Sequence, residues 1–121
     1  MSPDDWRARL NAMEGRRWPV RSGMNLWPEE VVRLREGIWP RDAQDRWAVW
    51  LEGEELRCWH AWAGTCVFEA QVQLAEDGSG TVGVLDILDD PVLYSRARTE
   101  LAELDRFEGL LRLALNPREG T

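Results

Sequence analysis

The first third of the chain carries short helical patterns separated by proline and glycine. Ser2 before Pro3 is typical of a helix start, because serine caps the first amides and proline fits the first turn. Apolar residues then recur at helical spacing as far as Gly15, and these are Trp6, Leu10 and Met13. A second short helix is predicted over 28–37, with Val31, Val32 and Leu34 apolar. Residues 16–26 have no period and are predicted to form an extended loop.

From Trp47 onward the apolar period changes to two, which predicts β-strands. Four strands are predicted, at 47–52, 56–62, 65–75 and 81–88. A two-residue turn at Ala63-Gly64 joins the second and third strands. The third strand places on one face Cys66, Phe68, Ala70, Val72 and Leu74. Connections this short allow only antiparallel neighbours, so the strands should form a meander.

The C-terminal region returns to helical spacing. Asp90-Pro91 predicts one helix start, and Thr99 predicts a second cap. Behind Thr99 one face carries Leu101, Leu104, Phe107, Leu111 and Ala114, and Asn116-Pro117 should stop the helix. A single sheet must bury one face, and this helix is the expected cover.

We therefore predict an α+β fold, in which a four-stranded antiparallel meander is backed by a C-terminal helix. At 121 residues the chain suits one domain over 1–121. Within it we expect a tryptophan-rich helical and loop segment at 1–45 that wraps the sheet. The sheet itself should occupy 46–89, and the C-terminal helices 90–116.

Charge narrows the range of partners. The formal net charge is −7, and all fifteen basic residues are arginine, which a GC-rich coding bias explains without any function. Residues 1–62 carry 10 arginines and 11 acids, whereas 63–121 carry 5 arginines and 11 acids. This balance disfavours non-specific nucleic-acid binding and anionic membranes, which both need a positive field. The chain shows no leader and no membrane-length apolar run, so a soluble cytoplasmic protein is expected.

The segment 56–69 holds the only histidine and both cysteines. With the predicted turn, Cys58 and Cys66 are out of register for a disulfide, which favours reduced thiols. Together with His60 they would offer three ligands, fewer than structural zinc usually has and without its spacing, so we predict no metal and no cofactor. No triad partner stands at a fixed spacing from His60. We therefore expect that the cysteines are buried thiols and that His60 is a hydrogen-bonded structural residue.

Parts of the chain resemble a family of small uncharacterised bacterial proteins. That family has a tryptophan-rich strand, then a leucine leading into His-Arg-Ser-Trp-Thr-Gly-x-Cys-Ile-Tyr-Glu, and later Asp-Pro-x-x-Tyr with a leucine-rich terminal helix. The matching positions here are Leu56, Trp62, Gly64, Cys66, Val67, Phe68, Glu69, Asp90, Pro91, Tyr94 and the helix 104–115. The polar positions differ, since Trp59, His60, Ala61 and Ala63 replace histidine, arginine, serine and threonine. The resemblance implies the fold over 45–115 and implies no activity.

All eight tryptophans lie within the first 62 residues, and five have an arginine within two positions. Core packing explains most of them, but one small core seldom needs eight, so two or three should be partly exposed. Alternation points to Trp50, Trp59 and Arg57 as an exposed patch, which is typical of a binding surface. Adding His60 and Trp62 gives the predicted binding site.

Two functions from different classes fit this site. The first is a non-enzymatic protein-binding module, of an immunity, antitoxin or adaptor type, that uses the Arg/Trp hairpin surface. The alternative is a nucleotide-type ligand-binding protein or hydrolase, with tryptophan stacking, an Arg57 phosphate contact and His60 for proton transfer. A third possibility is a scaffold that binds through the acidic C-terminal half, with the hairpin tryptophans buried.

Overall fold

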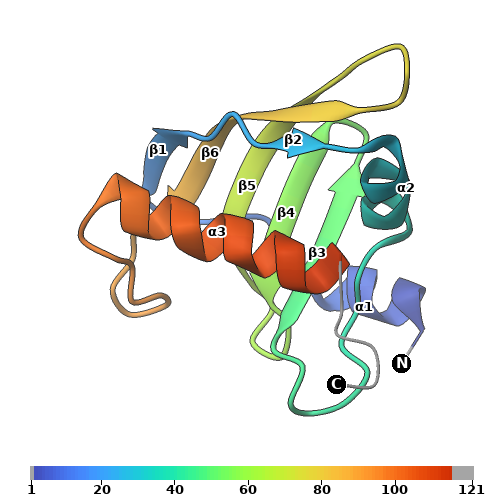
Figure 1. Ribbon diagram of the computed structural model, residues 1–121. Coiled ribbons are helices and arrows are strands. Elements are labelled where there is room, and N and C mark those ends of the chain that lie inside the picture. Colours follow the sequence, from blue (N-terminus) through green and yellow to red (C-terminus); the bar gives the residue numbers. More distant parts are fainter. Residues whose placement is uncertain (1, 116–121) are drawn as a thin grey trace.

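A computed structural model describes residues 2–115 (Figure 1). The elements are α1 (Pro3–Arg9), β1 (Arg17–Arg21), β2 (Asn25–Leu26), α2 (Pro28–Glu36), β3 (Trp47–Glu52), β4 (Glu55–His60), β5 (Thr65–Leu74), β6 (Gly80–Leu88) and α3 (Glu100–Leu115). The fold is α+β with an antiparallel sheet and a C-terminal helix, as predicted. Within the described part of the chain, no helix is both long and apolar enough to span a bilayer.

The sheet has six strands, so the predicted four-stranded meander is wrong in number. Its order is β1-β6-β5-β4-β3, and β2 also pairs with β6. Residues 16–26, predicted as a loop, supply the two extra strands. Pro19 in β1 lacks an amide donor, yet it is tolerated because β1 lies at the edge of the sheet. The pairing of β1 and β2 with β6 covers an edge of β6 that would otherwise be open to strands of other chains.

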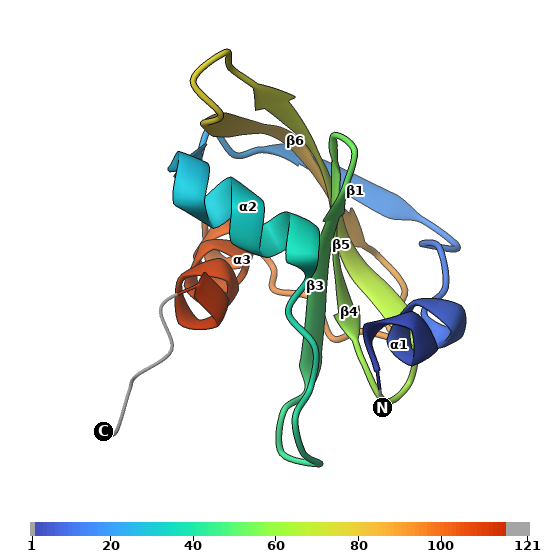
Figure 2. The same cartoon turned by 90° about the vertical axis from the view of Figure 1, so that its right-hand side faces the viewer.

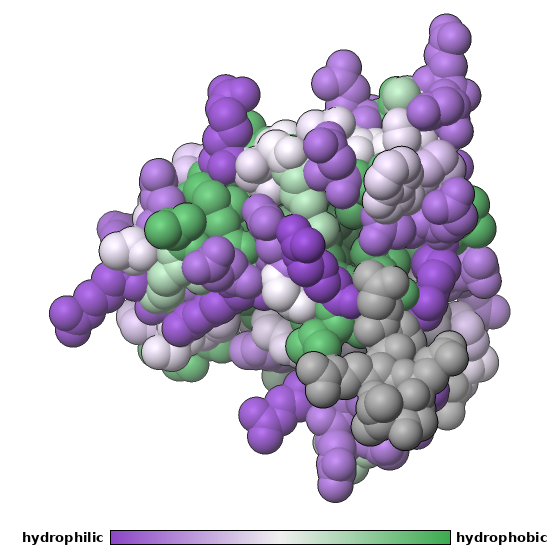
Figure 3. All heavy atoms as spheres, viewed as in Figure 1, coloured by the Kyte–Doolittle hydropathy of each residue, from purple (hydrophilic) through white to green (hydrophobic). Residues whose placement is uncertain are grey.

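One face of the sheet, the inner face, is covered by α3, which runs across the strands (Figure 1). Cys58, Phe68 and Ile87 stand opposite one another on neighbouring strands and so share this face. Phe107 of α3 packs on Phe68, with ring centroids 5.4 Å apart. In Figure 3 hydrophobic residues on the α3 side are interspersed with hydrophilic ones.

The opposite, outer face is covered only in part. Figure 2 shows α1 on the other side of the sheet from α2 and α3. Ser2 and Asp5 form a capping box, but the helix ends at Arg9, earlier than the predicted Gly15. Beyond it the chain stays bound to the sheet, since the Trp59 indole donates to the Asn11 carbonyl at 2.7 Å. Gly64 has a positive φ, and a Cβ there would lie 2.9 Å from the Arg9 carbonyl oxygen.

The connection between β4 and β5 differs from the prediction. His60 pairs with Thr65, so the turn spans the four residues 61–64 rather than two. A register shift then follows, because Trp59 pairs with Cys66 whereas Cys58 pairs with Phe68. This β-bulge breaks the alternation predicted from Cys66 onward and places Cys66 on the outer face with Trp59. Both cysteines are buried and free.

The C-terminal region confirms one predicted cap and corrects another. The Thr99 hydroxyl accepts the Ala102 amide at 3.1 Å, as a helix cap does. Asp90, in contrast, starts a single turn: its carboxylate accepts the Val92 amide and its carbonyl the Leu93 and Tyr94 amides, but no helix follows before α3. The predicted stop at Asn116-Pro117 lies outside the described residues.

The buried face of α3 also departs from the expected stripe. Leu101 is 69% exposed, whereas Glu103 is fully buried. The Glu103 carboxylate accepts the Tyr94 hydroxyl at 3.0 Å and the Ala97 amide at 2.5 Å. These bonds fix the segment between β6 and α3 against the helix. In this turn of α3 the buried side chain is therefore Glu103 and not Leu101.

Candidate functional site

The predicted residues Trp50, Arg57 and Trp59 lie together on the outer face of the β3–β4 hairpin. The register pairs Trp50 with Arg57 and Glu52 with Glu55. Directly opposed residues point to the same side of a sheet, so a tryptophan, an arginine and two glutamates share this surface. We name as the hairpin face the five residues Trp50, Glu52, Glu55, Arg57 and Trp59.

Arg57 is surrounded by carboxylates. Its guanidinium donates to Glu69 at 3.0 Å, lies 3.7 Å from Glu52, and also binds Glu55. Burial alone would lower the pKa of Arg57, but the bond to Glu69 and the charge of Glu55 outweigh it and raise the pKa. The guanidinium is therefore committed to these partners and is poorly placed to hold a phosphate.

The same network continues across the sheet. Arg17 of β1 bridges Glu69 at 2.8 Å and Asp86 at 3.1 Å. Burial opposes ionisation of Glu69, yet hydrogen bonds from Arg17 and Arg57 lower the pKa of that carboxyl overall. Four carboxylates (Glu52, Glu55, Glu69 and Asp86) thus meet two guanidiniums, a formal excess of two negative charges. The outer face around the hairpin is acidic.

Trp50 is partly exposed, and its neighbours hold it in place. Its indole donates to the Arg35 carbonyl at 3.1 Å, and the Arg7 guanidinium lies 4.5 Å from its ring centroid. Beside it a cavity of about 470 Å³ is lined by Arg7, Leu10, Asn11, Ala12, Trp50, Glu52, Arg57 and Trp59. Trp59, expected to be exposed, is only 4% accessible, because the chain after α1 covers it.

His60 and Trp62 lie away from this cavity. His60 is three residues from Arg57 and pairs with Trp47, so it faces the inner side of the sheet, 4.5 Å from the Trp47 ring. Burial, and then the charge of Arg46, lowers the pKa of His60. Trp62 is 46% exposed in the 61–64 turn and packs edge-on against Trp6. The structure therefore brings together three of the five predicted site residues, and the sheet separates His60 from Arg57.

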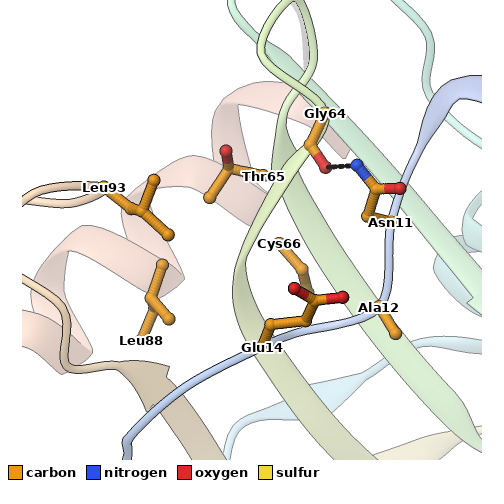
Figure 4. Close-up of a pocket in the computed structure, with 8 residues that line it drawn as sticks. All are labelled: Asn11, Ala12, Glu14, Gly64, Thr65, Cys66, Leu88 and Leu93. Atoms are coloured by element: carbon orange, nitrogen blue, oxygen red, sulfur yellow. Dashed lines mark hydrogen bonds between the residues drawn. The ribbon is translucent and has the colours of Figure 1, made fainter.

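The two thiols lie in protected positions. Burial, with a smaller contribution from Glu69, raises the pKa of Cys66 to about 12, and burial raises that of Cys58 well above its usual value. Cys66 borders a cavity of only about 100 Å³ beside Glu14, Gly64 and Leu88 (Figure 4). Neither thiol is set up as a nucleophile. Among residues 2–115 no group of three or more histidine, cysteine or acidic side chains is arranged to hold a metal ion.

A third cavity, of about 530 Å³, was not anticipated from the sequence. It lies between the end of α2, the 37–46 segment and α3, and its lining includes Arg33, Arg41, Arg46, Trp39 and Trp47. The sequence did contain a signal, because Trp39 and Trp47 each have an arginine within two positions. Only the fold shows that these pairs surround one space.

Comparison with known proteins adds no relative to this picture: no family model matches the chain, and no curated protein or solved structure is significantly similar to it.

Proposed function

We propose that this chain is a non-enzymatic binding protein that holds a basic segment of a protein partner on the hairpin face. The observation that carries the proposal is a partly exposed tryptophan next to Arg57 and its three carboxylates, at a cavity of about 470 Å³ that Arg7 also lines. Aromatic side chains in such settings often dominate binding energy, and surrounding charges select the partner.

Exposure of the acidic groups supports a cationic partner. The side chains of Glu52 and Glu55 are 59% and 42% accessible, so each can accept a further basic group while bound to Arg57. The chain also carries a net charge of −7, which speeds encounter with a basic protein. Inhibitors that block a basic surface, as immunity proteins and antitoxins do, and acidic adaptors use this chemistry.

The geometry gives less support to a nucleotide site at the hairpin. Arg57 is occupied by three carboxylates, and His60 lies on the opposite side of the sheet. A phosphate placed on the hairpin face would meet the exposed carboxylates of Glu52 and Glu55 beside an Arg57 that is already paired. Protein binding is therefore the function that we assign to this face.

Selection of peptides from a random display library on the immobilised protein tests the proposal. We expect enrichment of sequences with arginine or lysine near an aromatic or aliphatic residue. Synthetic versions should lose about tenfold or more in affinity for E52Q/E55Q, because a charged hydrogen bond is lost at each position. The W50F variant should also bind more weakly while keeping the core intact.

The matched control is E76Q/E100Q, which removes two exposed carboxylates elsewhere on the chain. If enriched peptides are acidic, or if they bind E52Q/E55Q and E76Q/E100Q equally well, the hairpin face is not the binding surface. Circular dichroism of each variant shows that a loss of binding does not come from unfolding.

A further inference from the structure

The cavity of about 530 Å³ has the size and position of a small-molecule site. It is bordered by the end of α2, the 37–46 segment, the first residue of β3 and the last turns of α3. Leu110, Leu113 and Ala114 of α3 line one side, and Arg41, Asp45 and Arg46 line the other. It is thus apolar on the α3 side and charged on the side of the 37–46 segment.

Its charge is opposite to that of the whole protein. Three guanidiniums and one carboxylate, that of Asp45, line it, which leaves a formal excess of two positive charges in a chain of net −7. Asp45 already accepts the Arg41 backbone amide at 2.9 Å. The Arg33 side chain donates to the Leu115 carbonyl at 3.0 Å.

The other two arginines are available to a ligand. Across residues 2–115, the guanidinium groups of Arg41 and Arg46 form no hydrogen bond or ion pair. Arginine presents several N–H donors in a planar fork that matches phosphate or carboxylate oxygens. Two such groups at one cavity, neither of them ion-paired to its single carboxylate, that of Asp45, favour an anion.

The aromatic part of the lining is held by the fold. Trp47 stacks on the buried Phe68 ring with an interplanar angle of 20° and a centroid distance of 5.9 Å. Trp39 donates its indole N–H to the Glu36 carbonyl at 3.3 Å. Gly37 has a positive φ, and a Cβ there would collide with the Trp39 ring. Rings fixed in this way contact a planar ligand with little further loss of side-chain entropy.

We propose that this cavity binds a small anion in which a planar ring is joined to a phosphate, the chemistry of a mononucleotide. Arg41 and Arg46 hold the phosphate, with Arg33 adding positive charge, and Trp39 and Trp47 contact the ring. The cavity shares no lining residue with the hairpin face, although the Trp39 ring lies 6.1 Å from that of Trp50, and the proposal stands whether or not that face binds a protein.

Titration calorimetry with adenosine monophosphate tests the proposal. We expect saturable binding that weakens about tenfold for each arginine lost in R41A and R46A, since each removes a charged hydrogen bond. R98A is the matched control, because Arg98 is exposed and outside this cavity. Ribose 5-phosphate, which lacks the base, should bind at least about fivefold more weakly if the ring contacts tryptophan.

Several outcomes would overturn the assignment. Absence of saturable heat at millimolar nucleotide would do so, as would equal losses in R41A, R46A and R98A. Equal affinity for ribose 5-phosphate and the nucleotide would remove the planar ring from the proposed class. Tighter binding of an acidic peptide than of any nucleotide would make the cavity a protein contact. None of these results bears on E52Q/E55Q, so the two proposals fail independently.

Discussion

Replacing Glu103 by alanine tests how far one buried carboxylate stabilises the C-terminal half of the fold. Glu103 is fully buried and accepts the Tyr94 hydroxyl, the Ala97 amide and the Arg106 guanidinium. The Arg106 side chain is 49% exposed, so its ion pair contributes little. The Tyr94 and Ala97 bonds lie in the interior, where each hydrogen bond to a charged group is worth about 1.5–3 kcal/mol.

We therefore expect E103A to lower the free energy of unfolding by about 3–5 kcal/mol, a large part of a typical total of about 5–15 kcal/mol. E103Q keeps the shape and one acceptor oxygen, so it should lose about half as much. Urea denaturation followed by circular dichroism measures both values. D105A, an exposed change on the same helix, is the control. A loss below about 0.5 kcal/mol for E103A would show that the network does not hold the 90–99 segment.

The remaining predictions concern titrating groups. Both cysteines should react with a disulfide reagent at least about a hundredfold more slowly in the folded than in the urea-unfolded protein, because burial raises the pKa of each thiol and blocks access to it. A thiol that reacts fast in the folded protein would contradict these buried positions. The pKa of His60, followed by its imidazole resonance, should lie below 6.5 and rise in R46A, since burial and then Arg46 lower it. The stability that His60 contributes is present above pH 6.5 and is lost as pH falls through the lowered pKa. The H60N variant should therefore lose less stability in acid than the wild type. Burial first, and Glu103 in addition, raise the pKa of Tyr94 from 10.0 to about 12. The stability that Tyr94 contributes is therefore complete below pH 10 and is lost as pH rises towards 12. Identical alkaline unfolding of wild type and Y94F would refute this.

Much of the fold was predictable because local patterns and tertiary packing agree. Apolar alternation located β3 to β6 to within about two residues at each end, an error that is usual at strand ends. The caps at Ser2 and Thr99 and the stop at Gly37 were also readable, since each satisfies a helix end with its own neighbours. These features depend on residues close in the sequence.

The candidate site was predictable only in part. Period-two alternation correctly placed Trp50, Arg57 and Trp59 on one side of the hairpin. Alternation does not reveal what covers a face, so the burial of Trp59 under the chain after α1 was missed. The carboxylates around Arg57 come from β5 as well as from the hairpin, and because of them we propose a basic protein segment at this face rather than the alternative nucleotide-type ligand.

The sequence by itself thus determined the four strands between residues 47 and 88, the helix behind Thr99, the antiparallel pairing of neighbouring strands, and which hairpin residues share a side. The tertiary structure decided that 17–26 completes the sheet, because an edge strand is stabilised by its partner β6 rather than by its own pattern. It also moved Cys66 to the outer face through a bulge and buried Glu103 among partners from the preceding loop. Finally, it gathered Arg33, Arg41 and Arg46 around two tryptophans, since side chains that meet across elements leave no local spacing to read.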